Sequence, residues 1–399
     1  MRTGICDQLG IEYPVLAFSH CRDVVAAVSR GGGFGVLGAT ALSPDQLEIE
    51  LRWIDEAVGG KPYGVDVLVP EKLAGMEKGA RFSAAALNEL IPEEHRRFLD
   101  ALLVEYGIDP APPDRGRHAE GRHAGGRHAG EDAADDEGQG AAGIAAGLSG
   151  AGALRLIEVA LTHPIRLVAN ALGAPPDEMI KAAHAADVPV AALAGKREHA
   201  IRHVAAGVDI VVAQGYEAGG HTGEIATMVL VPEIVDAVAP LPVLAAGGIA
   251  RGRQMAAAMA LGAQGVWTGS VWLTTAEAET HPVVKEKFLA AGSSDTLRSR
   301  SITGKPARQL RSAWTDAWDG PGSPGPLPMP LQPLLVDYAL HRIRRAAAAG
   351  SPGAVQLVNY FVGQVVGSLD TVRPARQVLH EMIAEYVDVV SGMSGALQC

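Results

Sequence analysis

The chain has 399 residues, 48% hydrophobic and 20% charged, enough to bury one barrel-sized core and an added lobe. Its formal net charge of −11 argues against a nucleic-acid partner, because phosphate backbones are bound by basic surfaces. No apolar stretch is long enough to span a bilayer, no secretory signal is apparent, and only three cysteines are present, so we expect a cytoplasmic protein without membrane attachment or disulfides.

Short apolar runs alternate with helical patterns along most of the chain, as in parallel α/β proteins. Most runs are continuous, which is typical of strands buried on both faces. Eight strands are expected, near Val15–Phe18, Gly35–Leu37, Tyr63–Leu68, Ile165–Ala169, Val188–Ala191, Asp209–Ala213, Pro242–Ala245 and Gly265–Thr268. Helices are expected at Arg22–Ser29, Pro44–Ala57, Pro176–Ala185, Lys196–Ala206, Val231–Val238 and Gly252–Leu261. Eight such units suit a closed (β/α)8 TIM barrel, although an open doubly wound sheet uses the same units.

Residues 107–147 interrupt this pattern. They are rich in Pro, Gly and charge, and carry three Arg-His-Ala repeats ahead of an acidic patch. Such a composition cannot bury enough apolar area to offset the cost of ordering the backbone. We therefore expect a disordered low-complexity insertion rather than a metal site built from its histidines, and no metal is predicted.

A second break, at residues 320–330, is dense in Pro and Gly. It leads into helical spacing at Leu334–Ala348 and Ala375–Val390, which indicates an added C-terminal, mainly helical lobe. The expected domains are a barrel at 1–106 and 148–319 and the lobe at 320–399.

Two glycine-containing turns follow consecutive predicted strands. The first contains Gly247 and Gly248 directly before a helix, and the second is Trp267-Thr268-Gly269-Ser270. Glycines let a phosphate approach the backbone, and a helix N-terminus offers N–H groups. A single such turn can simply end a strand, but two on adjacent barrel units predict the phosphate site that barrels place after their last two strands.

A third segment runs from Gln214 to Gly223 and holds His221 among glycines at the end of the sixth predicted strand. No helical or strand face is expected there, so a packed core histidine is disfavoured. Histidine is also the side chain best suited to proton transfer near neutral pH. We favour a catalytic role for His221; the alternative is that it holds the loop by a hydrogen bond.

Together, Gln214-Gly215-Tyr216-Glu217-Ala218-Gly219-Gly220-His221, Ala245-Ala246-Gly247-Gly248-Ile249 and Thr268-Gly269-Ser270 resemble the nitronate monooxygenase family, formerly called 2-nitropropane dioxygenases. Weaker matches run from Pro14 to Gly38, from Gly64 to Pro70 and through Gly363-Gln364, so the resemblance covers nearly the whole chain outside 107–147. It implies an FMN-dependent TIM-barrel oxidoreductase that oxidises alkyl nitronates with O2 to a carbonyl compound and nitrite.

The resemblance also implies roles for single residues. His221 matches the family's catalytic histidine, which takes a proton from the carbon bearing the nitro group or steadies the anionic substrate. The implied flavin contacts are Ala17 and Phe18 beside the ring system, Gln214 and Gly219 along the loop, and Gly247, Gly248, Trp267, Thr268, Gly269 and Ser270 at the phosphate and ribityl chain.

Three positions depart from the family pattern. Asp66 stands where the family commonly has Asn; an ionised carboxylate only accepts hydrogen bonds, so Asp66 is predicted to alter a flavin contact or carry a proton. After the first strand the family usually continues Pro-Met-Ala-Gly, whereas this chain has His20 there, either a second catalytic group or a cap for the next helix. Trp267 replaces a frequent Gln, which predicts a backbone contact only.

Other functions stay open from the residues alone. FMN-dependent enoyl-acyl-carrier-protein reductases share the motifs, so an NAD(P)H-dependent reductase of quinones or enoyl thioesters is the nearest alternative. From other classes come a barrel isomerase or lyase acting on a phosphorylated substrate and a flavin-binding protein without turnover. The expected partners are a small-molecule substrate with O2 or NAD(P)H, and a homo-oligomer is left open.

Overall fold

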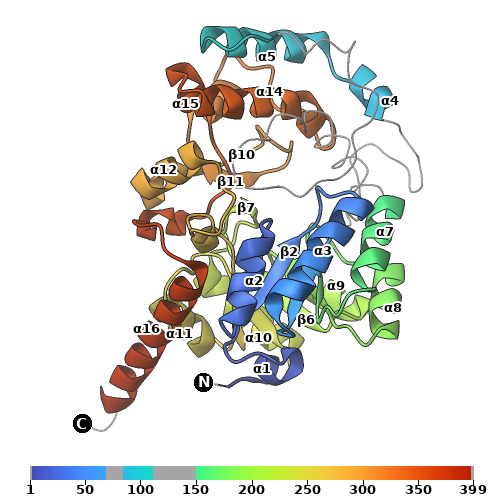
Figure 1. Ribbon diagram of the computed structural model, residues 1–399, viewed down its shortest axis with the longest axis vertical. Helices are drawn as coiled ribbons and strands as arrows, with labels where there is room; N and C mark the ends of the chain where they lie inside the picture. The colour runs from blue at the N-terminus through green and yellow to red at the C-terminus, as the bar shows by residue number, and fades with distance from the viewer. Residues whose placement is uncertain (1, 69–83, 111–149, 397–399) are drawn as a thin grey trace.

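The computed structural model describes residues 2–68, 84–110 and 150–396 (Figure 1). Its centre is a closed barrel of parallel strands in the order β1-β2-β3-β4-β5-β6-β8-β9. Their bounds are β1 Val15–Ser19, β2 Phe34–Gly38, β3 Tyr63–Asp66, β4 Val168–Asn170, β5 Val190–Ala194, β6 Ile210–Gln214, β8 Val243–Ala246 and β9 Gly265–Thr268. All eight predicted strands are confirmed, and closure between β1 and β9 excludes the open doubly wound sheet.

Large apolar side chains at alternate positions along the strands fill the barrel, as the twofold side-chain repeat of a strand requires. Leu16, Phe34, Leu167, Ile210 and Leu244 all belong to this interior cluster. Helix α1 (Gly4–Leu9) lies beneath the barrel and adds Ile5 and Leu9 to the same cluster (Figure 1). Because the bottom of the barrel is filled, a ligand can enter only from the carboxyl ends of the strands.

Helices surround the barrel: α2 (Arg22–Arg30), α3 (Pro44–Val58), α7 (Gly150–Ala160), α8 (Asp177–Ala185), α9 (Arg197–Ala206), α10 (Thr227–Val238) and α11 (Gly252–Ala260). The six helices predicted between strands are confirmed, with α10 starting four residues earlier than expected. Helix α3 illustrates the local signals: Ser43 and Gln46 form a reciprocal capping box at its start. Gly59, in the left-handed conformation, ends it.

A polar cluster ties α3 to the turn before β4. His163 contacts Asp55 through Nδ1 at 2.6 Å and Glu48 through Nε2 at 3.0 Å. The Tyr63 hydroxyl donates to the other oxygen of Asp55 at 2.6 Å. Burial lowers the pKa of His163, but the bonds to both carboxylates outweigh it and raise that pKa overall.

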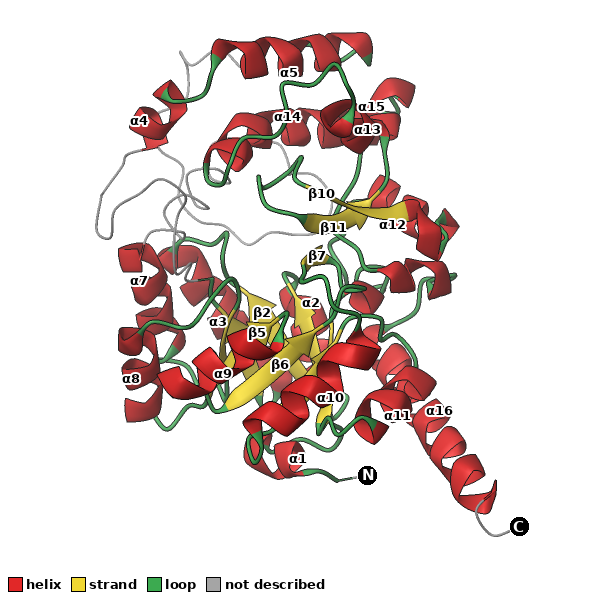
Figure 2. Ribbon diagram, turned by 180° about the vertical axis from the view of Figure 1, so that it is seen from behind, coloured by secondary structure: helices red, strands yellow, loops and turns green. Residues whose placement is uncertain are grey.

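The remaining elements form a lobe over the carboxyl ends of the strands (Figures 1 and 2). It contains α4 (Ala84–Glu89), α5 (Glu93–Glu105), α12 (Pro282–Ala290), α13 (Ala313–Asp319), α14 (Leu331–Ala348) and α15 (Pro352–Leu357). Three short 3-10 helices, η1 (Ser270–Trp272), η2 (Ser293–Asp295) and η3 (Gln364–Ser368), link these parts. The helical C-terminal region expected from the sequence is confirmed, including both predicted helices.

The sequence pattern did not predict two features of the lobe. Helix α5, from the segment expected in the barrel, lies against α14, and the Tyr338 hydroxyl donates to Asp100 at 2.9 Å (Figure 2). A small antiparallel sheet joins β10 (Thr296–Ser299), β11 (Ala307–Leu310) and β7 (Gly220–His221). The domain division stays a prediction, and the expected insertion falls, from residue 111 to 147, outside the described residues.

Helix α16 (Ala375–Ala396) leaves the lobe and runs down the outside of the barrel beside α11 (Figure 1). Within the described ranges, no helix combines the length and apolar composition needed to cross a membrane.

Candidate active site

A cavity of about 2410 Å³ opens between the carboxyl ends of the barrel strands and the lobe. It brings together nearly all the residues singled out from the sequence: Phe18, His20, Asp66, Gln214, Gly219, His221, Gly247, Gly248, Trp267, Thr268, Gly269 and Ser270. Ala17 is the exception, because it is fully buried and packs in the layer between barrel and helices. Any contact of Ala17 with a ligand would therefore run through its backbone.

The two predicted phosphate turns lie on adjacent strands, since Ala246 of β8 is in register with Trp267 of β9. Gly247 and Gly248 have φ of 94° and 72°, a conformation that glycine adopts without strain. Among the described residues, the backbone N–H groups of Gly247, Gly248, Gly269 and Ser270 have no hydrogen-bond acceptor. These amides fit a phosphate group, so the turns can hold the end of a flavin mononucleotide.

The hydroxyl groups of the second turn, on Thr268 and Ser270, form hydrogen bonds with other parts of the chain. The Thr268 hydroxyl donates to the Leu16 carbonyl at 3.0 Å and accepts from Trp272 Nε1 at 2.9 Å. Ser270 Oγ accepts from the Gly363 amide at 2.8 Å, which leaves its own proton available for an anion. A phosphate here would therefore be held by the backbone and by Ser270, with Thr268 shaping the turn.

The N-terminus of α11 differs from the expectation that its N–H groups are unpaired. Gln254 Oε1 accepts from the amides of Ala250 at 2.8 Å and Arg251 at 3.0 Å. The carboxylate of Glu385, on α16, accepts from the Arg253 amide at 3.5 Å. Glu385 lies far ahead in the chain and Gln254 lies one turn into the helix. The sequence of the glycine turn alone therefore could not predict either acceptor.

His221 is on β7, not in an irregular glycine loop as expected, and pairs with Ala307 of β11. Its Nδ1 lies 3.3 Å from the Pro306 carbonyl, which can only accept, so Nδ1 carries the proton and Nε2 is bare. Burial lowers the pKa of His221 to about 4; the Pro306 bond opposes this shift and the nearby Lys305 adds to it. The imidazole is therefore neutral at pH 7 and can accept a proton at Nε2.

His20 and Asp66 lie at the ends of β1 and β3, and β1 is the neighbour of β9, the strand that leads into the second phosphate turn. His20 Nδ1 donates to the Gly38 carbonyl at 3.0 Å, and its ring packs edge-on against Phe18 at 5.1 Å. Helix α2 begins after Cys21 without a cap from His20, which removes the capping interpretation. Burial raises the pKa of Asp66 to about 7, and its carboxyl group has no partner among the described residues.

The segment around Gly363 is a part of the site that sequence reasoning underrated. Gly219 and Gly363 touch so closely that a Cβ on Gly219 would lie 2.8 Å from the Gly363 nitrogen. The Gln364 amide donates to the Glu217 carbonyl at 2.9 Å. The C-terminal segment therefore closes against the strand-six loop, and the Gly363-Gln364 pair was the only sequence signal for it.

Three further cavity residues were missed. Glu217 accepts from the Thr227 amide and hydroxyl, both at 2.9 Å, and so fixes the start of α10. Lys305 and Arg344 line the cavity, and neither cation has an ion pair or hydrogen bond with any residue that the structure describes. Burial lowers the pKa of Lys305. Free amides, a neutral histidine and these two cations are thus available in the cavity to an anionic ligand.

The fold and the site define a class: a (β/α)8-barrel enzyme with free backbone amides and a histidine at the carboxyl ends of its strands. A family model described as nitronate monooxygenase matches residues 5–96 and 125–385. The chain belongs to the nitronate monooxygenase family, and it is a flavin-dependent oxidoreductase.

Individual relatives agree with this placement. The chain is 61% identical over 400 residues to "Putative monooxygenase Rv1533" of Mycobacterium tuberculosis, with 100% of both chains covered. It is 27% identical over 397 residues to a "Probable nitronate monooxygenase" of Staphylococcus aureus strain Newman, with 96% of each covered. A solved nitroalkane oxidase of Streptomyces ansochromogenes shares the fold, with a TM-score of 0.73, 24% identity, and coverage of 97% of this chain and 99% of that one.

Proposed function

We propose that this protein is an FMN-dependent nitronate monooxygenase that oxidises an alkyl nitronate with O2 to a carbonyl compound and nitrite. The observation that carries the proposal is the placement of His221. Its bare Nε2 belongs to a cavity that also holds the free amides of the phosphate turns. The name of the Staphylococcus aureus relative, a probable nitronate monooxygenase, supports the same reaction.

The residues of this chain would bind the flavin and orient the substrate. Gly247, Gly248, Gly269 and Ser270 would hold the phosphate of FMN, and Phe18 and Trp267, stacked with centroids 6.4 Å apart, would border the ring system. When bound, the flavin supplies the redox chemistry, accepting electrons from the substrate and passing them to O2. His221 would accept a hydrogen bond or a proton at Nε2, and Lys305 beside it would favour a negative charge on the substrate.

The electrostatics of His221 favour a preformed nitronate over a neutral nitroalkane. A base with a pKa of about 4 drives proton abstraction from carbon weakly, since the efficiency of a general base falls as its pKa drops below the working pH. A nitronate has already lost that proton and needs only a place for its charge. We therefore propose the anion as the better substrate, with slow oxidation of the neutral form.

One experiment tests the cofactor and the reaction together. Heating the purified protein should release FMN, identified by chromatography, and aerobic turnover of ethyl nitronate should yield nitrite. Release of FAD, or a flavin-loaded protein that forms no nitrite from any alkyl nitronate, would contradict the proposal.

A second candidate is an NAD(P)H-dependent reductase of quinones or enoyl thioesters. The cavity exceeds the roughly 300–1,000 Å³ that small-molecule sites occupy, so it leaves room beyond the flavin. Lys305 and Arg344 could pair with the phosphates of a dinucleotide. Sustained NADPH consumption with a quinone, without nitrite formation from nitronates, would favour this candidate.

A further inference from the structure

Helix α16 is packed directly against the first turn of α11, the helix that follows the Gly247-Gly248 turn. A Cβ on Gly252 would lie 2.1 Å from the Met382 carbonyl oxygen and 2.3 Å from the Tyr386 nitrogen. Only glycine permits this backbone-to-backbone contact. The position of α16 therefore determines where α11 begins.

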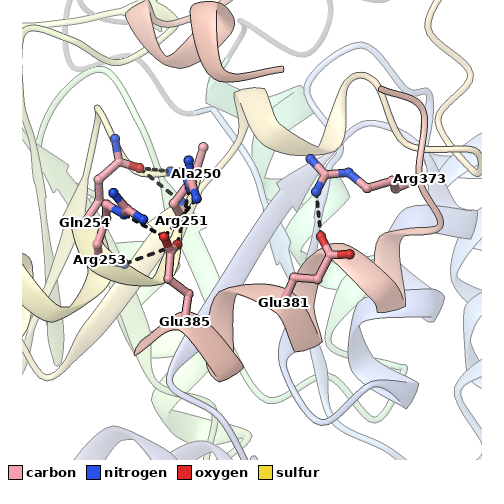
Figure 3. A network of polar contacts seen from close by, with 7 residues as sticks. All are labelled: Ala250, Arg251, Arg253, Gln254, Arg373, Glu381 and Glu385. Atoms are coloured by element: carbon pink, nitrogen blue, oxygen red, sulfur yellow. Dashed lines mark hydrogen bonds and ion pairs between the residues drawn. The ribbon is translucent and has the colours of Figure 1, made fainter. Parts of the chain in front are cut away.

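Glu385 joins the two helices at that point (Figure 3). One carboxylate oxygen accepts from Arg251 Nη2 at 2.9 Å and from Arg253 Nε at 2.6 Å. The other accepts from Arg251 Nε at 3.4 Å and from the Arg253 amide at 3.5 Å. Its side chain is only 19% exposed, so the bonds are partly shielded from water. Gln254 binds the same stretch of backbone from inside the helix.

Hydrogen bonds restrain both ends of the short loop from Ala246 to Arg251. Ala246 is fixed at its start, because the carbonyl of Ala246 accepts from the Gly215 amide at 2.9 Å. Glu385 and Gln254 fix Arg251 at its end. Between them lie Gly247 and Gly248, two residues of high backbone freedom whose amides are unpaired within the described chain. A phosphate site made of such amides depends on their being ordered before the ligand arrives.

We propose that Glu385, on the C-terminal helix, is a positioning residue for the flavin phosphate: it holds the loop of Gly247 and Gly248 in its binding conformation through Arg251 and Arg253. This inference rests on the proposed function, because it assumes that those amides bind the FMN phosphate. It gives α16, none of whose residues line the cavity, a role in holding the cofactor.

A test must separate two effects of Glu385 on FMN binding: its negative charge and its positioning of the loop. Removing the Glu385 carboxylate also removes a negative charge near the phosphate site, which by itself would tighten FMN binding. Removing Arg253 breaks the same contact and changes the charge in the opposite direction. Glu381, on the same helix as Glu385, supplies a matched control, because its carboxylate accepts from Arg373, just before α16, and from Gln377, and not from α11 (Figure 3).

The experiment compares FMN with riboflavin, which lacks the phosphate, in fluorescence titrations of the full-length apoprotein and its variants at 0.15 M salt. The unmodified chain is expected to prefer FMN about tenfold or more, as charge-assisted bonds to a phosphate provide. Glu385→Gln and Arg253→Gln should each raise the Kd for FMN about fivefold while changing the Kd for riboflavin little. Glu381→Gln should keep the full preference, and melting curves without flavin confirm that each variant folds.

Four results would overturn the inference. If both variants keep the full FMN preference, Glu385 does not act on the phosphate loop, while the proposed function stands. If Glu385→Gln tightens FMN binding and Arg253→Gln weakens it, charge acts directly. If both flavins weaken equally, the contact only stabilises the fold. If the unmodified chain does not distinguish FMN from riboflavin, the phosphate site itself is misassigned and the inference fails with it.

Discussion

Replacing His221 with Asn separates proton abstraction from the rest of the proposed reaction. Asn keeps a side chain that can donate to the Pro306 carbonyl but cannot exchange a proton near neutral pH. The amides that would hold the flavin phosphate are on other strands, so His221→Asn should still bind FMN. Turnover of a neutral nitroalkane, which must lose a proton, should fall much more than turnover of the preformed nitronate.

The size of the loss follows from the basicity of the imidazole. General-base catalysis typically contributes about 10²–10⁴-fold, and a base with a pKa of about 4 belongs at the lower end. We expect a loss of roughly a hundredfold in kcat/KM for nitroethane, or about 2.7 kcal/mol of transition-state stabilisation. For ethyl nitronate we expect a loss of less than about tenfold, from weaker binding of the anion alone.

Initial rates of nitrite release at fixed O2 provide the assay, with the FMN content of each sample as the control. In Asp66→Asn, which lacks the cavity carboxyl group whose pKa is about 7, kcat/KM for nitroethane should stay level from pH 8 down to about 5.5 and decline only as His221 becomes protonated near pH 4. A histidine with the ordinary pKa of about 6.5 would instead be only about one-tenth neutral at pH 5.5. Equal losses on both substrates, or a decline centred near pH 6.5, would refute the reasoning.

Three further changes test the structure. Burial holds the pKa of Asp66 near 7, above its unfolded value, so the protein loses stability as pH rises between these two values. In urea titrations, Asp66→Asn should be more stable than the unmodified chain by up to about 4 kcal/mol at pH 8 and equally stable at pH 4. An equal gain at both pH values would contradict this. The pKa of His163 is raised in the folded protein, so its contribution to stability is complete below about pH 6.5 and declines as pH rises through the folded pKa. His163→Gln should lower the free energy of unfolding by about 2–3 kcal/mol at pH 6 and by less at pH 9. A larger loss at pH 9 would contradict this. Gly252→Ala should cost about 1–3 kcal/mol by displacing α16, whereas Gly392→Ala, inside the same helix with open space around it, should stabilise by about 0.5–1 kcal/mol; thermal melting measures both, and equal effects would contradict this.

Much of the fold was predictable because the signals are local. The barrel strands are buried on both faces and therefore read as continuous apolar runs, as in Val211–Ala213. Helix α3 carries a Ser43 cap and a Pro at its first position. The phosphate turns were recognisable because positive φ and close approach both select glycine, as at Gly247 and Gly248.

The parts that escaped prediction depend on pairing between distant segments. Strand β7 is two residues long and contains Gly220, so no periodicity marks it; its partner β11 lies about ninety residues further on. Glu385 is 132 residues from Arg253, and nothing near either residue indicates the contact. The pKa shifts of Asp66 and His221 come from burial in a cavity that exists only after the barrel and the lobe have assembled.

The central claim is that electrons enter this enzyme from a nitronate. The most direct test mixes the flavin-loaded protein, without O2, separately with ethyl nitronate and with NADPH, and follows the flavin absorbance in a stopped-flow instrument. The proposal predicts rapid bleaching by the nitronate and none beyond a slow drift with NADPH. Rapid bleaching by NADPH with no response to the nitronate would contradict it and assign the site to a reductase.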